Sequence, residues 1–143
     1  MAGIEGIEKL FNRVKRLKNA VKQTERPLRV SAVYMLGSID KNFAAEGRAE
    51  KWKGLADSTK ARRRGKRHKI LTDTARLRRS HSYRISSGGA EIGTNVIYAP
   101  RQHFGYPGGS GRGRSKTPSR KFLMFQEEDI RQIGEIFSRH VRS

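Results

Sequence analysis

Apolar residues at intervals of three and four predict a long amphipathic helix at the beginning of the chain. They are Ile4, Ile7, Leu10, Phe11, Val14, Leu17 and Val21. Most charged residues of this segment fall on the other helical faces. Thr24 is a candidate N-cap, and a second helix with its own apolar positions is predicted from about Pro27 to Ala45. We interpret both as core helices that pack against the rest of the protein.

The next segment carries few large apolar residues and no periodic face. Residues 47–69 are therefore predicted to form a loop, with at most a short helix around 58–63. A short helix is then expected to begin within residues 70–80, where Thr72 or Asp73 can cap it.

From His81 onward, the spacing of apolar residues changes from the helical period of 3.6 residues to the strand period of two residues. Residues 82–86 alternate, a Ser-Gly-Gly turn follows, and residues 90–94 return, which predicts a β-hairpin. Residues 100–119 are so rich in glycine and proline that we expect a long flexible loop with no fixed element.

The end of the chain predicts one strand and one helix. The apolar run at residues 121–125 suits a short strand. Three acids at 127–129 and basic residues near the C-terminus match the dipole of a last helix. This order of elements indicates an α+β fold with N-terminal helices, a small, mostly antiparallel β-sheet with long loops, and a C-terminal helix. We expect a single domain over residues 1–143, with a helical N-terminal region at residues 1–46 and mobile loops at 57–69 and 100–119.

Charge narrows the choice of partners. The 143 residues include 32 Lys and Arg against 13 Asp and Glu, a net charge of +19. Such a protein attracts nucleic acid, acidic proteins or anionic membranes. Seven Lys and Arg lie within residues 60–69, and residues 92–126 contain no acid. The hydrophobic fraction of 34% predicts a thin core, with some segments becoming ordered only against a partner.

The chemistry available to the chain points away from catalysis. There is no cysteine, and His68, His81, His103 and His140 lack the close spacing of a metal site. Acids are scarce in the middle of the chain, where a hydrolase or metal nuclease would need them. No apolar run is long enough to cross a membrane, and the N-terminus does not resemble a signal peptide. We expect no enzymatic activity, no metal and no cofactor.

Five blocks of sequence resemble, in order, the motifs of a known phage family. Residues 52–59 are similar to W-x-x-L-x-x-x-T, 70–80 to I-L-x-D-T-G-x-L-R-x-S, and 92–99 to I-G-T-x-x-x-Y-A. Residues 102–105 and 118–123 match the two blocks that follow, h-Q-x-G and P-A-R-P-F-L. The family is that of tailed-phage virion morphogenesis proteins, the tail-completion proteins of Mu-like phages.

The resemblance implies a structural virion protein. Such proteins resemble subunits of a ring, often six-fold, which completes or terminates the tail at the neck, where head and tail join and DNA passes through the lumen. The expected partners are further copies of the chain, tail tube and connector proteins, and genomic DNA without sequence readout, but no membrane. The expected location is the virion, with assembly in the bacterial host cytoplasm. One alternative is a nucleic-acid-binding protein without sequence specificity, and another is a small basic nuclease that depends on His81 or His103.

Two sets of residues are candidates for these contacts. Contacts with another subunit or a neighbouring ring are expected from Trp52, Leu55, Arg76, Arg78, Arg120 and Phe122. For each of the three arginines, an ion pair within the chain is an equal alternative to a carboxylate of a neighbour. Contacts with DNA or an acidic partner are expected from Arg62, Arg63, Arg64, Lys66, Arg67, Arg112, Arg114 and Lys116.

Overall fold

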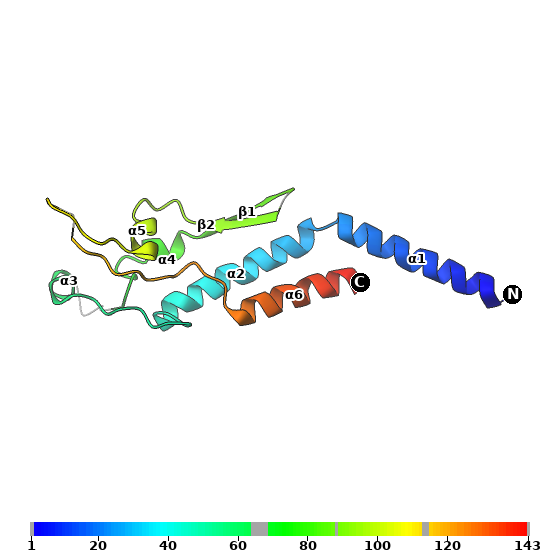
Figure 1. Ribbon diagram of the computed structural model, residues 1–143, viewed down its shortest axis with the longest axis horizontal. Coiled ribbons are helices and arrows are strands. Elements are labelled where there is room, and N and C mark those ends of the chain that lie inside the picture. Colours follow the sequence, from blue (N-terminus) through cyan, green and yellow to red (C-terminus); the bar gives the residue numbers. More distant parts are fainter. Residues whose placement is uncertain (1, 64–68, 88, 113–114, 143) are drawn as a thin grey trace.

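The protein is elongated and built around one central helix (Figure 1). The computed structural model describes residues 2–63, 69–87, 89–112 and 115–142, with side chains from Gly6 onward. Its helices and two-stranded antiparallel sheet confirm the predicted α+β fold, with helices at both ends of the chain.

Two long helices follow one another at the N-terminus. The first, α1 (Ala2–Lys22), is joined by Gln23 and Thr24 to α2 (Glu25–Ala45), close to the predicted ranges. Thr24 does occupy the N-cap of α2, but its side chain makes no capping hydrogen bond. The last helix, α6 (Glu127–Arg142), runs beside α2 in the opposite direction, as Figure 1 shows.

The expectation that the first helix packs as a core helix is wrong. α1 extends beyond the end of α2 instead of lying on it (Figure 1). Six apolar side chains of α1 are between 38% and 72% exposed: Ile7, Leu10, Phe11, Val14, Leu17 and Val21. A tertiary contact holds the C-terminal end of α1, where His140 Nε2 on α6 lies 3.0 Å from the carbonyl oxygen of Ala20.

The predicted hairpin is confirmed. Strands β1 (Ser82–Ser86) and β2 (Gly89–Gly93) pair antiparallel, with Tyr83 opposite Ile92. Both strands contact α2, so α2 lies between the hairpin and α6.

The core lies at the C-terminal half of α2. Ile39 and Phe43 are buried there together with Trp52, Leu77 and Phe122. The Phe43 ring centroid lies 5.5 Å from that of Trp52 and 5.4 Å from that of Phe122. These rings join segments that are far apart in the sequence, so the middle of the chain is folded around this end of α2.

No strand forms at residues 121–125, where one was predicted. The backbone there bonds to side chains rather than to a neighbouring strand. Asn42 Nδ2 donates to the Phe122 carbonyl at 2.8 Å, and Trp52 Nε1 donates to the Lys121 carbonyl at 3.2 Å. These two bonds satisfy backbone carbonyls that a neighbouring strand would otherwise pair.

The expectation that residues 100–119 hold no fixed element is wrong at both ends of that segment. Helix α5 (Ala99–Phe104) starts with Pro100 in its first turn, where a missing N–H costs nothing. Tyr106 and Thr117 then pair as an isolated antiparallel bridge. Gly105 has a φ of 78° and allows residues 117–119 to approach its backbone closely. A Cβ at this position would lie 2.8 Å from the Ser119 nitrogen.

Two short helices complete the middle of the chain. α3 (Asp57–Arg62) coincides with the short helix expected around 58–63. The helix predicted within residues 70–80 is reduced to α4 (Arg76–Arg79), and neither Thr72 nor Asp73 caps it. Leu71 and Ala75 have φ values of 56° and 59°, and this left-handed backbone prevents a longer helix.

Candidate assembly surfaces

Asp129 ties α6 to α2 and is fully buried. Its carboxylate accepts hydrogen bonds from Ser38 Oγ at 2.7 Å, Tyr34 OH at 3.1 Å and the Gln126 backbone N–H at 2.8 Å. Arg48 Nη2 adds a charge partner at 3.7 Å. Burial, together with the bond to Asp129, raises the pKa of Tyr34, which keeps its hydroxyl a donor. The start of α6 is therefore held in place by several bonds at once.

Three residues predicted to contact a neighbour are buried within the chain. Trp52 is 8% exposed, Phe122 1% and Arg120 6%. The guanidinium of Arg120 donates to the carbonyls of Lys53 at 2.9 Å and Gly54 at 3.0 Å. Burial lowers the pKa of Arg120, and the charge of Arg63 acts in the same direction. This arginine fixes the segment after Trp52, and all three residues contribute to the interior of the protein rather than to an exposed surface. Leu55 is partly buried against the same core.

Arg78 forms an ion pair within the chain. Its Nε and Nη2 atoms donate to the two carboxylate oxygens of Asp40 at 2.6 and 2.9 Å. The hydrogen bond from Arg78 lowers the pKa of Asp40, and the same bond raises the pKa of Arg78. Arg76 is exposed, with its guanidinium carbon 6.0 Å from the centre of the Tyr98 ring.

The basic residues predicted to contact DNA or an acidic partner have different surroundings. Arg62 is exposed at the end of α3, and Arg112 and Lys116 are exposed in the loop after α5. Arg63 is different, because its side chain is 8% exposed and lies 4.0 Å from Asp73. The remaining members of this set lie outside the described residues: Arg64, Lys66, Arg67 and Arg114.

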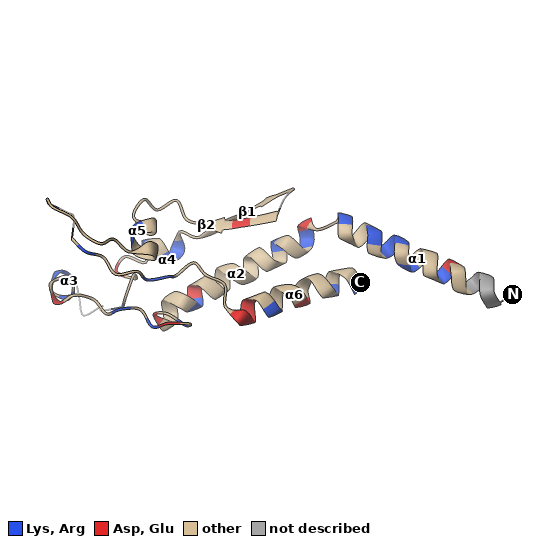
Figure 2. Ribbon diagram, viewed as in Figure 1, with Lys and Arg blue, Asp and Glu red and all other residues tan. Residues whose placement is uncertain are grey.

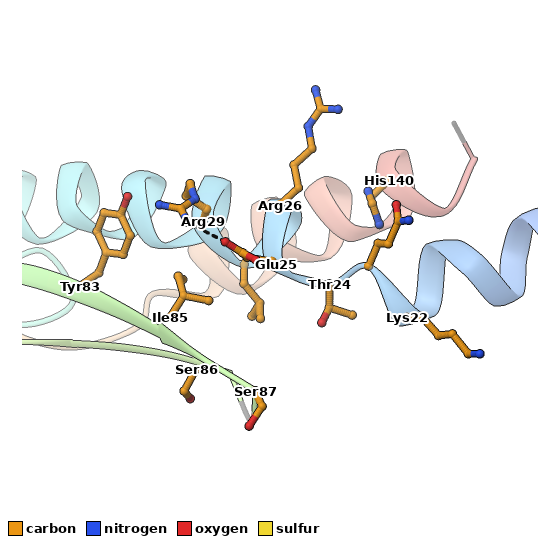
Figure 3. Close-up of a pocket in the computed structure, with 12 residues that line it drawn as sticks. Lys22, Thr24, Glu25, Arg26, Arg29, Tyr83, Ile85, Ser86, Ser87 and His140 are labelled. Carbon is orange, nitrogen blue, oxygen red and sulfur yellow. Dashed lines mark hydrogen bonds and ion pairs between the residues drawn. The ribbon is translucent and has the colours of Figure 1, made fainter.

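A wide groove of about 1160 Å³ lies between the hairpin and the junction of α1 and α2. Tyr83 and Ile85 of β1 face Glu25 and Arg29 of α2 across it (Figure 3). Arg29 Nη2 donates to Glu25 Oε1 at 2.8 Å, and this bond, followed by the one to Tyr83, raises the pKa of Arg29. Because the acid of this groove is already paired, we assign it no catalytic role.

Two histidines pack among the aromatic rings of the core. The His81 ring centroid lies 5.4 Å from that of Phe122, and the His103 ring centroid lies 5.0 Å from it. Burial lowers the pKa of both imidazoles, and the charge of Lys121 adds to the effect at His103. Within the regions of the chain that the structure describes, no three His, Asp or Glu side chains are placed to hold a metal ion. Both histidines are accounted for by packing.

Comparison with known proteins identifies the family. The sequence matches the phage virion morphogenesis family over residues 4–142, nearly the whole chain. The chain belongs to the phage virion morphogenesis family. No curated protein and no solved structure matches it.

Membership in the phage virion morphogenesis family gives the protein a structural role in building the virion. The resemblance seen in the five sequence blocks is thereby confirmed. Among the described residues, no helix is both long enough and apolar enough to span a membrane.

Sequence reasoning missed the surfaces that the structure leaves uncovered. The apolar face of α1 is one of these surfaces. In addition, two large apolar side chains are exposed at the start of α6: Phe125 by 59% and Ile130 by 63%. Ile97 and Phe104 are exposed near α5. The apolar face of α1 was visible as a periodic pattern, but nothing in that pattern says whether the same chain covers it.

Proposed function

We propose that this protein is a tail-completion or tail-terminator subunit, which forms a ring at the head–tail junction and joins the tail to the head. In this role it performs no catalysis. Genomic DNA passes through the lumen of the ring, and the tail tube and connector proteins contact its two sides. The observation that carries the proposal is the match to the phage virion morphogenesis family over almost the entire chain.

Two features of the fold support an assembly role. Large apolar side chains are exposed at both ends of the helical region, on α1 and at the start of α6. A structural subunit needs such surfaces, because exposed apolar groups gain stability when a neighbour covers them. The segments at 57–69 and 100–119 are the proposed arms toward neighbouring rings, and their described parts carry exposed Arg62, Arg112 and Lys116.

Cryo-electron microscopy of particles assembled with and without the protein tests the proposal. We expect ring-shaped density at the neck, and separate heads and tails when the protein is missing. Normally joined particles without the protein would refute the joining role.

The charge of +19 favours a second candidate, a nucleic-acid-binding protein without sequence specificity. Binding through many Lys and Arg residues weakens steeply as salt increases. Titration of the purified protein with double-stranded DNA at two salt concentrations separates the candidates. Tight DNA binding that collapses with salt, together with normally joined particles in the absence of the protein, would favour this second function.

A further inference from the structure

The apolar face of α1 is a regular strip that the described part of the chain leaves exposed, although Leu17 lies near Val141 at the end of α6. Ile7, Leu10, Val14, Leu17 and Val21 follow one another at alternating steps of three and four residues. That spacing keeps the five side chains along one line of a helix that packs against another helix. All of them are exposed, and α1 points away from the rest of the molecule (Figure 1). We call these residues the α1 strip.

Charge decides which surface suits the α1 strip. Residues 6–22 contain six Lys and Arg and one Glu. Two α1 helices packed against each other would bring Arg13 and Lys18 together beside the strip, and like charges in these flanking positions repel. An acidic surface with exposed apolar groups is a better match.

The start of α6 has both properties. Its first turn contains Glu127 and Glu128, which are exposed. Phe125 precedes the turn and Ile130 follows it, with exposures of 59% and 63%. We call these four residues, which surround the start of α6, the α6 patch. Figure 2 shows its acids at the end of α6 far from α1, whereas basic residues lie along α1.

The α6 patch is also anchored to the rest of the subunit by hydrogen bonds. Asp129 lies within the same turn and is bonded to Tyr34, Ser38 and the Gln126 backbone. A surface held in place in the free subunit costs less ordering when it binds. Because α1 points away from the patch (Figure 1), the two surfaces cannot meet within one molecule.

We propose that the α1 strip of one subunit docks on the α6 patch of a second copy of the same chain. Apolar side chains meet in the middle of this contact, and the Lys and Arg residues of α1 face Glu127 and Glu128 of the neighbour. The two surfaces differ, so each subunit uses one of each and the contacts run head to tail. Such contacts close into a ring when the rotation between neighbours permits. This inference rests on the proposed function, for which it supplies the subunit interface.

Two single substitutions on the full chain test the contact. Val14→Asp places a carboxylate in the α1 strip, and Ile130→Asp places one in the α6 patch. We expect each variant to lose assembly completely and to fall to the monomer mass of 16.2 kDa in light scattering after size exclusion. The wild-type protein should instead form species heavier than a dimer.

Asn12→Asp is the matched control. It adds the same carboxylate to the opposite face of α1, so its assembly should equal that of the wild type. Ile97→Asp provides the same comparison for an exposed apolar residue outside both surfaces. Circular dichroism of every variant verifies that the helices are retained.

Mixing the two variants gives the sharpest result. Val14→Asp retains its α6 patch and Ile130→Asp retains its α1 strip, so one intact contact should form and yield a complex of twice the monomer mass. No complex in the mixture, or assembly of Ile130→Asp alone, would overturn the proposal in favour of α1 packing on α1. A wild-type protein that is monomeric at its highest soluble concentration would also overturn it.

Two further results distinguish a contact between subunits from a membrane contact and from the joining role. Binding of the wild type to phosphatidylglycerol vesicles, lost in Val14→Asp, with no complex in the mixture, would replace the second copy by a membrane. Solution assembly through the two surfaces, combined with normal head–tail joining in the absence of the protein, would refute the proposed function and leave the contact established.

Discussion

α1 and α2 have the same length of 21 residues, but their surroundings differ. α2 is covered by α6 on one side and by the hairpin and the following loops on others, and Ile39 and Phe43 on it are buried. α1 is held near its C-terminal end by His140. The comparison teaches that an amphipathic pattern predicts that a helix face will be covered, but not which molecule covers it.

The most direct way to break this comparison is to shorten one aliphatic side chain on each helix. Ile39→Ala on α2 should lower the free energy of unfolding by about 2–5 kcal/mol, because it leaves a cavity in the core. Leu10→Ala on α1, where the side chain is 61% exposed, should change it by less than about 0.5 kcal/mol. Urea denaturation at low protein concentration measures both. Equal losses would mean that α1 is as well packed as α2.

The next largest effect on stability is expected at Asp129, whose hydrogen bonds connect α6 to α2. Asp129→Asn keeps the shape but removes the charge, and an amide cannot accept all three hydrogen bonds that the carboxylate accepts. We expect a loss of about 2–3 kcal/mol in the free energy of unfolding, which urea denaturation measures. The control is Glu128→Gln, the equivalent change on an exposed neighbour, which should stay within about 0.5 kcal/mol.

Acidification should weaken the core around α2 rather than α1. The folded protein holds His81 and His103 with lowered pKa values, so the unfolded chain binds protons first as the pH falls. The free energy of unfolding should therefore decrease as the pH falls below the ordinary histidine value of 6.5, until the lowered folded pKa values are reached.

The substitution His81→Phe tests the source of this pH dependence. It removes one titrating group and keeps a ring among Phe43 and Phe122, so the slope of stability with pH below the ordinary histidine pKa should become smaller. An unchanged slope would show that burial of His81 does not contribute.

The smallest effect on stability is expected from the surface ion pair between Asp40 of α2 and Arg78 of α4. The side chain of Asp40 is 53% exposed and that of Arg78 25%, so solvent screens their attraction. A double-mutant cycle with Asp40→Asn and Arg78→Gln should give a coupling of about 0.2–1 kcal/mol. This coupling should decrease further in high salt, and a value that salt leaves unchanged would contradict the assignment to screened charges.

Regular periodicity was sufficient to predict the long helices and the hairpin. In these elements apolar positions recur every 3.6 residues or every two residues, and the local geometry of a helix or a strand alone imposes those periods. The register was not predicted: Gly89, which was assigned to the turn, pairs with Ser86 in the hairpin. These elements need no knowledge of what they pack against.

Segments whose structure depends on distant residues were not predictable in this way. Residues 121–125 have the composition of a strand, but their carbonyls bond to Asn42 and Trp52. Pro100 was interpreted as a helix breaker but lies in the first turn of α5. In both places the deciding contact or position lies outside the pattern of the segment itself.

The burial of the candidate site residues could not be predicted from the sequence. Trp52, Arg120 and Phe122 stand in motif blocks, and the structure shows why those blocks need them, since all three hold the core together. The presence of a tryptophan or phenylalanine in a motif does not show whether the residue lies in the core or at an interface. The exposed residues of the α1 strip and the α6 patch became visible only when the burial of each side chain was known.

The junction of α1 and α2 also sets a mechanical property. A 21-residue helix is about 30 Å long, so a rotation of roughly 10° at Gln23 and Thr24 displaces its free end by about 5 Å. The contact between His140 and Ala20 lies close to this pivot and moves little during such a rotation. A small change at this junction would therefore move the free end of α1 much further than it moves the contact with α6.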